Sequence, residues 1–146
     1  MQSSSETKHL VIAWVILVST VAIHIVDEIM TDFLPFYSQF VTDLRSELGF
    51  FPLPTYSFGS WIGGVWGAVI LGYALTPIVA RAGKLIRVVV SVIAVLMLVN
   101  GLLHLSLSWY FGTWVPGATS SPVLLFASVF LLGRVWPNKR KRAMPA

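Results

Sequence analysis

Cysteine is absent from this chain of 146 residues, and charged residues make up only 11% of it. Without cysteine there is no disulfide framework, thiolate metal site or cysteine nucleophile, so any chemistry must use histidine, carboxylate, amide and hydroxyl groups. The shortage of charge excludes an ordinary soluble domain, because 56% of the residues are hydrophobic and the mean hydropathy is +0.81. The 6 Trp, 4 Tyr and 9 Phe residues also exclude a disordered chain.

The formal net charge of +4 raises the question of a nucleic-acid partner. The 10 Lys and Arg residues, however, form no nucleic-acid-binding motif and lie at the ends of apolar runs. We therefore expect the lipid bilayer as the partner and no nucleic acid. The sequence leaves the oligomeric state open, a homo-oligomer included.

Long apolar runs dominate the sequence. A helix needs roughly 20 mostly apolar residues to cross about 30 Å of hydrocarbon, and three runs reach that length while a fourth is slightly shorter. The predicted fold class is all-α, an integral membrane bundle of four transmembrane helices. The expected spans are residues 10–30, 58–80, 88–107 and 120–136, all approximate.

A further helix is predicted in the loop between the first two spans. Apolar residues recur there with helical periodicity, and polar residues occupy the opposite face. Asp32 suits the N-cap and Gly49 the C-terminal stop. The pattern predicts an amphipathic helix over about residues 33–48, in the first extracytoplasmic loop, that lies on the membrane surface or caps the bundle.

The Lys and Arg residues are distributed unevenly between the two sides of the predicted bundle. Only Arg45 lies in the loops that follow the first and third spans; the other nine lie near the termini or between the second and third spans. Because positive charge is retained in the cytoplasm, both termini are expected there, as an N-terminus of residues 1–9 and a basic tail of residues 137–146. The first span ends in two acids with no small-residue cleavage site, so we expect it to be kept.

Two of the predicted spans carry polar residues that hydrocarbon disfavours. His24, Asp27 and Glu28 share one face of the first span at spacings i, i+3 and i+4, and Asn100 and His104 share one face of the third at i and i+4. Counted at 1.5 Å per residue from the start of each span, His24 lies about 21 Å deep and His104 about 24 Å. Both faces are therefore expected in one layer, in the outer half of the membrane.

Each of these residues also has a purely structural explanation. Asp27 and Glu28 could form the water-exposed end of the first span. His24 and Asn100 could each make a hydrogen bond that joins two helices. The meeting of all five residues at one level favours a functional site, because ionisable groups inside spans are costly and are usually retained for function.

Small residues spaced four apart mark the second span. They are Gly63 and Gly67 on one line, and Gly64, Ala68 and Gly72 on another. Small residues let a neighbouring helix approach closely, so this span is predicted to pack at the centre of the bundle.

The polar motifs resemble those of a known family. His24-Ile25-Val26-Asp27-Glu28 resembles the H-x-x-E-E signature of the HXXEE family of small four-span membrane proteins, with Asp27 in place of the first Glu. Asn100 and His104 are similar to its N-x-x-x-H signature, and Pro116-Gly117 agrees with the end of a third, in which Tyr110 stands at the position of a His. The resemblance implies a four-helix membrane protein in which the polar motifs meet.

The first functional hypothesis is a membrane enzyme that performs acid/base chemistry on a lipophilic small molecule. His24, Asp27, Glu28 and His104 would donate and remove protons, and Asn100 would orient a partner or the substrate. Isomerisation or cyclisation fits a site that opens to the outer half of the bilayer.

The second hypothesis uses His24, Asp27, Glu28 and His104 as ligands of a single divalent metal ion. Two imidazoles and two carboxylates on facing helices suit zinc, iron or manganese. No other cofactor is expected. A third hypothesis is a non-enzyme that handles protons or ions, or an accessory membrane protein, although the lack of an internal repeat argues against an alternating-access transporter.

Overall fold

The structure, a computed structural model, describes residues 4–136, and within that range it contains helices and no strands. The all-α prediction is confirmed for these residues, while the predicted basic tail, 137–146, lies outside them. Two helices, α1 and α5, are long and apolar enough to cross a membrane, and α3 and α6 are shorter apolar helices. In chain order the helices are α1 (Ser4–Met30), α2 (Phe33–Leu48), α3 (Phe58–Ala74), α4 (Thr76–Val79), α5 (Lys84–Phe111) and α6 (Ser121–Val135).

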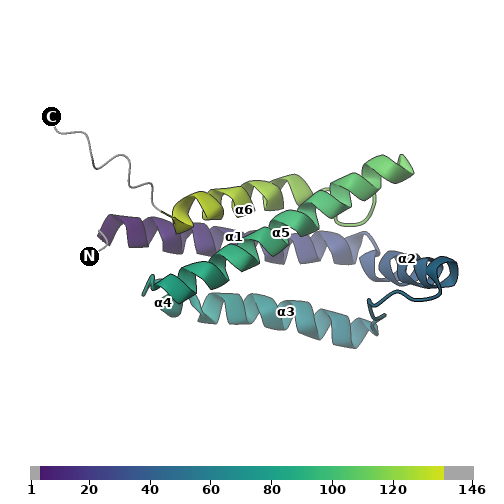
Figure 1. The fold of residues 1–146 in the computed structure, drawn as a ribbon, viewed down its shortest axis with the longest axis horizontal. Coiled ribbons are helices and arrows are strands. Elements are labelled where there is room, and N and C mark those ends of the chain that lie inside the picture. The colour runs from purple at the N-terminus through teal and green to yellow at the C-terminus, as the bar shows by residue number, and fades with distance from the viewer. Residues whose placement is uncertain (1–3, 137–146) are drawn as a thin grey trace.

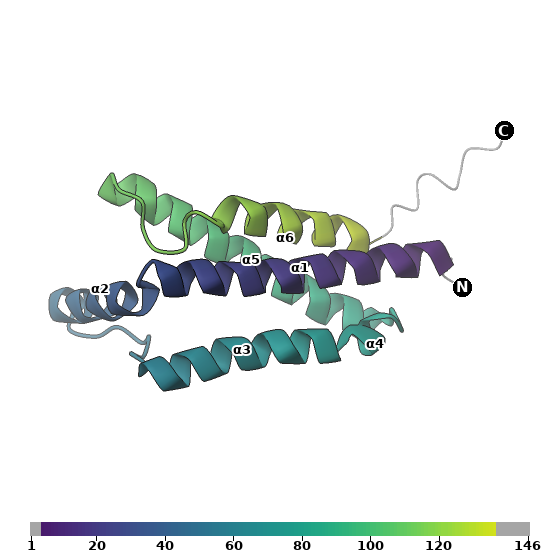
Figure 2. The ribbon, with the colours of Figure 1, turned by 180° about the vertical axis from the view of Figure 1, so that it is seen from behind.

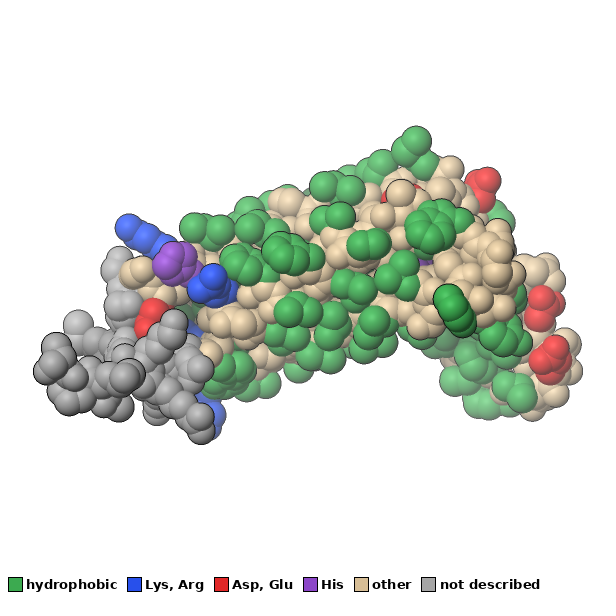
Figure 3. All heavy atoms as spheres, turned by 90° about the horizontal axis from the view of Figure 1, so that it is seen from above, with side chains coloured by type: hydrophobic (Ala, Val, Ile, Leu, Met, Phe, Trp, Pro, Cys, Tyr) green, Lys and Arg blue, Asp and Glu red, His purple; other side chains and the backbone are tan. Residues whose placement is uncertain are grey.

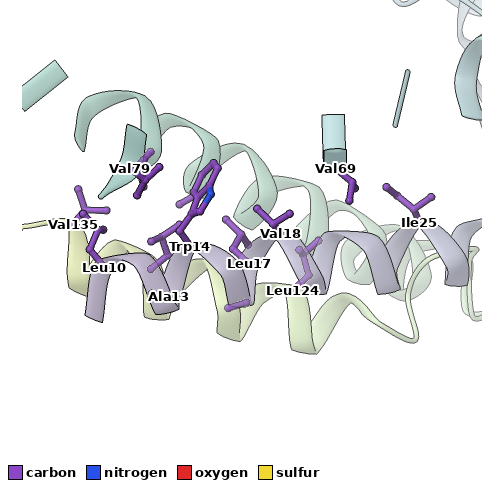
Figure 4. Close-up of a cluster of buried hydrophobic side chains, with 14 residues drawn as sticks. Leu10, Ala13, Trp14, Leu17, Val18, Ile25, Val69, Val79, Leu124 and Val135 are labelled. Atoms are coloured by element: carbon purple, nitrogen blue, oxygen red, sulfur yellow. The ribbon is translucent and has the colours of Figure 1, made fainter. Parts of the chain in front are cut away.

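The centre of the fold is α6, which packs along both α1 and α5 in the two largest interfaces between helices. Figures 1 and 2 show α6 beside α1 over most of its length, with α5 crossing obliquely. Leu124 and Leu131 of α6 and Leu10 and Leu17 of α1 are almost completely buried and belong to one hydrophobic cluster. Figure 4 shows these α1 side chains aligned along the seam between the helices. Because α6 packs against both α1 and α5, this apolar interface fixes the position of the polar face of α1 relative to that of α5.

The predicted central position of the second span is wrong. In both ribbon views α3 lies on the side of α1 opposite α6 (Figures 1 and 2). Of its glycines, Gly72 lies closest to α1: a Cβ there would lie 3.0 Å from Val18, and the carbonyl accepts the Trp14 indole N–H at 2.9 Å. A Cβ at Gly63, Gly64 or Gly67 would meet nothing within 4 Å. Small residues permit close packing without requiring it, and α6 buries more apolar surface against α1.

The predicted second span, residues 58–80, is not one continuous helix in the structure. The helix ends after Ala74, and the short helix α4 follows with Pro77 in its first turn. Proline has no N–H to donate to the carbonyl four residues earlier, so a continuous helix through this point loses a hydrogen bond.

The amphipathic helix is confirmed as α2, with the bounds that the sequence predicted. It lies at the end of the molecule where α1 ends (Figure 1). Gly49 ends it in the left-handed conformation, with φ 72°. Asp32 occupies the N-cap position, but its φ of 58° is also left-handed and its side chain makes no capping hydrogen bond. The predicted N-cap position of Asp32 is therefore confirmed, although its side chain does not form the cap.

The segment that joins α2 to α3 is tied back onto α2. Arg45 donates from Nε to the Phe51 carbonyl at 3.3 Å and from Nη2 to the Leu53 carbonyl. The Tyr37 hydroxyl donates to the Pro54 carbonyl at 2.9 Å. Burial, with Tyr56 close by, raises the pKa of Tyr37, which keeps this hydroxyl a donor. The segment is thereby fixed over the end of the bundle.

The outer surface separates apolar and charged side chains. Figure 3 shows hydrophobic side chains over the middle of the visible face, with Lys and Arg gathered at one end and acidic side chains mostly toward the other. Ile23, Ile70 and Val92 are each more than half exposed although they belong to long apolar helices. The bundle therefore presents an apolar band between two polar ends.

Arg87, in the first turn of α5, is the one basic side chain buried among residues 4–136. Its Nε donates to the Ala82 carbonyl at 3.0 Å, and Nη1 donates to the Val135 carbonyl at the end of α6. A cation at the C-terminus of a helix is stabilised by the helix dipole and by the free carbonyl groups there. Arg87 therefore fastens the start of α5 to the end of α6.

We expect Arg87→Leu to lower the free energy of unfolding by about 2 kcal/mol, because charge-assisted hydrogen bonds to buried carbonyls are lost. The measurement is the thermal unfolding transition in detergent. Arg81→Leu is the matched control, since Arg81 is exposed in the same turn region. Equal destabilisation by both changes would show that the Arg87 contact to α6 contributes nothing.

Candidate metal centre

Three buried side chains from two helices converge on one point. His24 and Glu28 lie one turn apart on α1, and His104 of α5 faces them; the three residues are 3%, 5% and 4% exposed. Glu28 Oε1 is 3.5 Å from Nε2 of His24 and 3.3 Å from Nε2 of His104. The imidazole centroids are 4.9 Å apart, edge to face. The structure thus brings together the two polar faces that the spacing predicted, through three of the five residues.

The hydrogen bond of His104 fixes which of its nitrogens carries hydrogen. Nδ1 is 2.6 Å from the Pro116 carbonyl oxygen, which can only accept, so Nδ1 donates. In the neutral ring Nε2 then has a free lone pair, and that lone pair faces Glu28.

A serine and a carboxylate fix the tautomer of His24, and it is the same tautomer as that of His104. The Ser120 hydroxyl donates to Asp27 Oδ2 at 2.7 Å, and the Ser120 backbone N–H donates to the same oxygen at 2.9 Å. A hydroxyl has one hydrogen, so the 2.7 Å contact between Ser120 Oγ and His24 Nδ1 requires Nδ1 to donate. Nε2 of His24 is left with its lone pair, buried and without a hydrogen-bond partner among residues 4–136.

The centre therefore consists of three acceptor atoms, two imidazole nitrogens and a carboxylate oxygen, that face one another in a buried site. Acceptors at this separation repel unless a positive charge lies between them, and the candidates are a proton and a metal ion. For metal–ligand bonds of about 2.1 Å, the edge of a coordination tetrahedron is about 3.4 Å. The two edges that meet at Glu28 Oε1, 3.3 and 3.5 Å, match that value, and the three ligand atoms all lie within 4.8 Å of one another.

The other two predicted residues have different positions. Asp27 lies behind His24, on the far side of Ser120, and supports the orientation of the imidazole. Such an outer partner fixes the ring and raises its basicity. Asn100 lies one turn before His104 on α5, outside the group of three, and its buried side-chain oxygen has no hydrogen-bond partner among the described residues. The structure gives it no contact with the centre.

The loop between α5 and α6 covers the centre and supplies its outer contacts. Ser108 Oγ accepts the Val115 N–H at 3.1 Å, and Thr31 Oγ1 accepts the Gly117 N–H at 3.2 Å, so the loop folds back onto both α5 and α1. The sequence analysis did not predict the roles of Gly117 and Ser120. The one signal in the sequence was Pro116-Gly117, in the third motif of the family resemblance.

A cavity of about 340 Å³ borders the centre on the Glu28 side. It lies between the end of α1, the start of α2 and the start of α3. Its walls are Glu28, Ile29, Asp32, Phe33, Leu34, Pro35, Ser38, Tyr56, Phe58 and Trp61.

No protein-family model matches this chain, and comparisons with curated proteins and with solved structures also give no match. The resemblance to the HXXEE family therefore rests on the motifs alone and stays a prediction.

Gly117 allows the loop to approach the centre. A Cβ at this position would lie 2.7 Å from Cε1 and 2.8 Å from Nδ1 of His104, and its φ of +81° is left-handed. We expect Gly117→Ala to displace the His104 ring and to lower the free energy of unfolding by about 2–4 kcal/mol, from overpacking and backbone strain. Thermal unfolding and the imidazole nitrogen NMR signals of His104 measure the two effects.

Gly112 provides the matched control, because its φ of +64° is also left-handed but a Cβ there would meet nothing within 4 Å. Gly112→Ala should cost about 1 kcal/mol, from strain alone, and leave the His104 signals in place. Identical behaviour of the two variants would contradict a role for Gly117 in positioning His104.

Proposed function

We propose that this chain is a four-span integral membrane protein, and a metal-dependent enzyme for a lipophilic substrate, whose His24, Glu28 and His104 bind one divalent ion. The observation that carries the proposal is the convergence of three buried acceptor atoms, in which Glu28 Oε1 lies 3.3 and 3.5 Å from the two imidazole Nε2 atoms, with both imidazoles held in the tautomer that presents Nε2. Zinc, iron and manganese all accept this mixture of nitrogen and oxygen donors.

The membrane part of the proposal is supported by the lengths of the helices, their exposed apolar side chains and the distribution of charged residues. In the proposed arrangement α1 and α5 cross the bilayer in full, and α3 together with α4 forms a third span. α6 covers about 22 Å at 1.5 Å per residue, and Arg134 in its last turn can extend its side chain to the interface. The distribution of Lys and Arg supports a topology with both termini in the cytoplasm and the His/Glu/His centre in the outer half of the membrane.

The catalytic part is supported by the number of donors and by the adjoining cavity. Structural zinc sites usually have four protein ligands, whereas catalytic sites have three and keep one position for water or substrate. A bound ion would supply Lewis acidity or an activated water there. Asp27 acts through Ser120, and the Pro116 carbonyl acts directly, to hold the two imidazoles in place. Glu28 joins the centre to the cavity wall.

The same geometry supports a second candidate, acid/base catalysis without a metal. Both Nε2 atoms lie within 3.5 Å of Glu28 Oε1, so one proton can be shared between either imidazole and the carboxylate. The reaction class of this second candidate is isomerisation or cyclisation. Metal analysis distinguishes the metal-dependent enzyme from the metal-free one.

The protein purified in detergent and exposed to zinc, iron or manganese should bind about one ion per chain. His24→Ala, His104→Ala and Glu28→Gln should each abolish this binding, because each removes one of three donors. Asp27→Asn should weaken it by about tenfold, the lower end of the usual effect of an outer-shell partner. Metal content after dialysis against a weak chelator, measured by mass spectrometry, gives the result.

His9→Ala is the matched control, since His9 is exposed and outside the centre. It should retain full metal content. Wild-type protein that binds none of the three metals would eliminate the metal centre and leave acid/base chemistry. Metal lost equally from the His9 variant would show that binding occurs elsewhere.

The orientation can be tested with single cysteines, because the natural chain has none. Gln39→Cys in α2 and Thr113→Cys in the loop before α6 should react with an impermeant thiol reagent added to intact cells. Ala80→Cys should react only after permeabilisation. All three positions are exposed. Reaction of Ala80→Cys in intact cells would invert the proposed topology.

A further inference from the structure

We propose that the cavity beside the centre binds an alkylated ammonium group, such as the choline headgroup of an amphiphile. The inference rests on the proposed function in one respect: it takes the cavity as the substrate pocket of the His/Glu/His centre. At about 340 Å³ the cavity is at the lower end of the range for small-molecule sites, which suits a headgroup better than a whole lipid.

The walls of the cavity are aromatic on two sides. Phe33, Tyr56, Phe58 and Trp61 all line it. The Phe33 and Trp61 centroids are 6.0 Å apart, and those of Phe58 and Trp61 are 6.2 Å apart, so these rings form a continuous wall. Aromatic walls attract cations through their electron-rich faces, and their use in proteins is to hold quaternary ammonium groups.

The charged residues around the cavity are acidic. Glu28 and Asp32 line it, and no Lys or Arg does. Arg45, the basic residue of α2, donates to the carbonyls of Phe51 and Leu53 instead. Three carboxylates lie at or beside the cavity, those of Asp27, Glu28 and Asp32. A divalent ion in the proposed centre would leave one of these three negative charges unbalanced, and a monovalent cation in the cavity would balance it.

Asp32 is the carboxylate that remains available to such a cation. It occupies the N-cap of α2, yet its side chain makes no capping hydrogen bond. Its backbone is left-handed, at φ 58°, a conformation that aspartate adopts more readily than most residues other than glycine. The residue therefore contributes to the cavity wall rather than to helix capping.

A second cavity supplies a place for an apolar chain. It has a volume of about 240 Å³ and lies between α1, α3 and α5. Its walls carry no charged side chain, and they include Leu17, Val21, Ala68 and Met97. Val21 is seven residues before Glu28 on α1, which corresponds to about 10 Å. An alkyl chain attached to a headgroup beside Glu28 would have to extend about 10 Å along α1 to enter this cavity.

The test compares choline with 3,3-dimethyl-1-butanol, which has the same shape with carbon in place of the charged nitrogen. The full-length protein is kept in a maltoside detergent, which contains no ammonium group. Ligand-observed NMR titration should show saturable binding of choline, about tenfold tighter than that of the neutral compound. Equal binding of the two, or no saturable binding of choline, would overturn the proposal.

Variants then locate the site. Asp32→Asn should weaken choline binding about threefold, and Trp61→Leu about fivefold. The matched controls are Asp43→Asn, on the exposed face of α2, and Trp66→Leu, on α3 away from the cavity walls, and neither should change it. Losses of equal size in the controls would place choline elsewhere and overturn the assignment to this cavity.

The proposed metal centre is judged separately by the metal content of the same preparations. Asp32→Asn and Trp61→Leu should bind metal as the wild type does, since neither supplies a ligand. Stoichiometric metal without choline binding overturns the headgroup proposal alone. Choline binding without metal supports the headgroup site and removes only the metal centre.

Discussion

The mutual repulsion of three acceptor atoms is the constraint on which the site depends. Nε2 of His24, Nε2 of His104 and Oε1 of Glu28 face one another in a buried space, and only a shared positive charge makes that arrangement favourable. The hydrogen bonds made by the two Nδ1 atoms preserve this arrangement. The Pro116 carbonyl and the Ser120 hydroxyl each take the hydrogen of an Nδ1 atom, so both rings present a lone pair inward.

The helices that carry these atoms are held together mainly by a third. α1 and α5 touch each other little, and α6 fills the space between them with fully buried leucines. Arg87 ties α5 to α6 at one end, and the loop that precedes α6 ties α5 to α1 at the other. The spacing of the imidazoles is thus set by apolar packing some distance away. Substitutions in the α6 core are expected to act on the centre through this spacing.

Periodic features of the sequence predicted the structure well, and irregular ones did not. Helical periodicity and Gly49 gave the bounds of α2, and the i, i+4 pairs placed His24, Glu28 and His104 together. The role of Ser120 was missed because helical periodicity relates the residues of the predicted fourth span to one another but does not relate its first residue to α1. The central position predicted for α3 was wrong, because its glycines allow a close neighbour but supply no apolar surface to attract one.

The loop that closes over the centre also sets the order in which the site is completed during synthesis. His24, Asp27 and Glu28 emerge from the ribosome first, about 75 residues before His104, at ≈ 5–20 residues/s. Pro116 and Ser120 follow, and α6 comes last. Until α6 packs against α1 and α5, the early helix carries unsatisfied polar groups, so the nascent chain holds an incomplete site. Assembly of the site therefore depends on the folding of α6 onto the helices made before it.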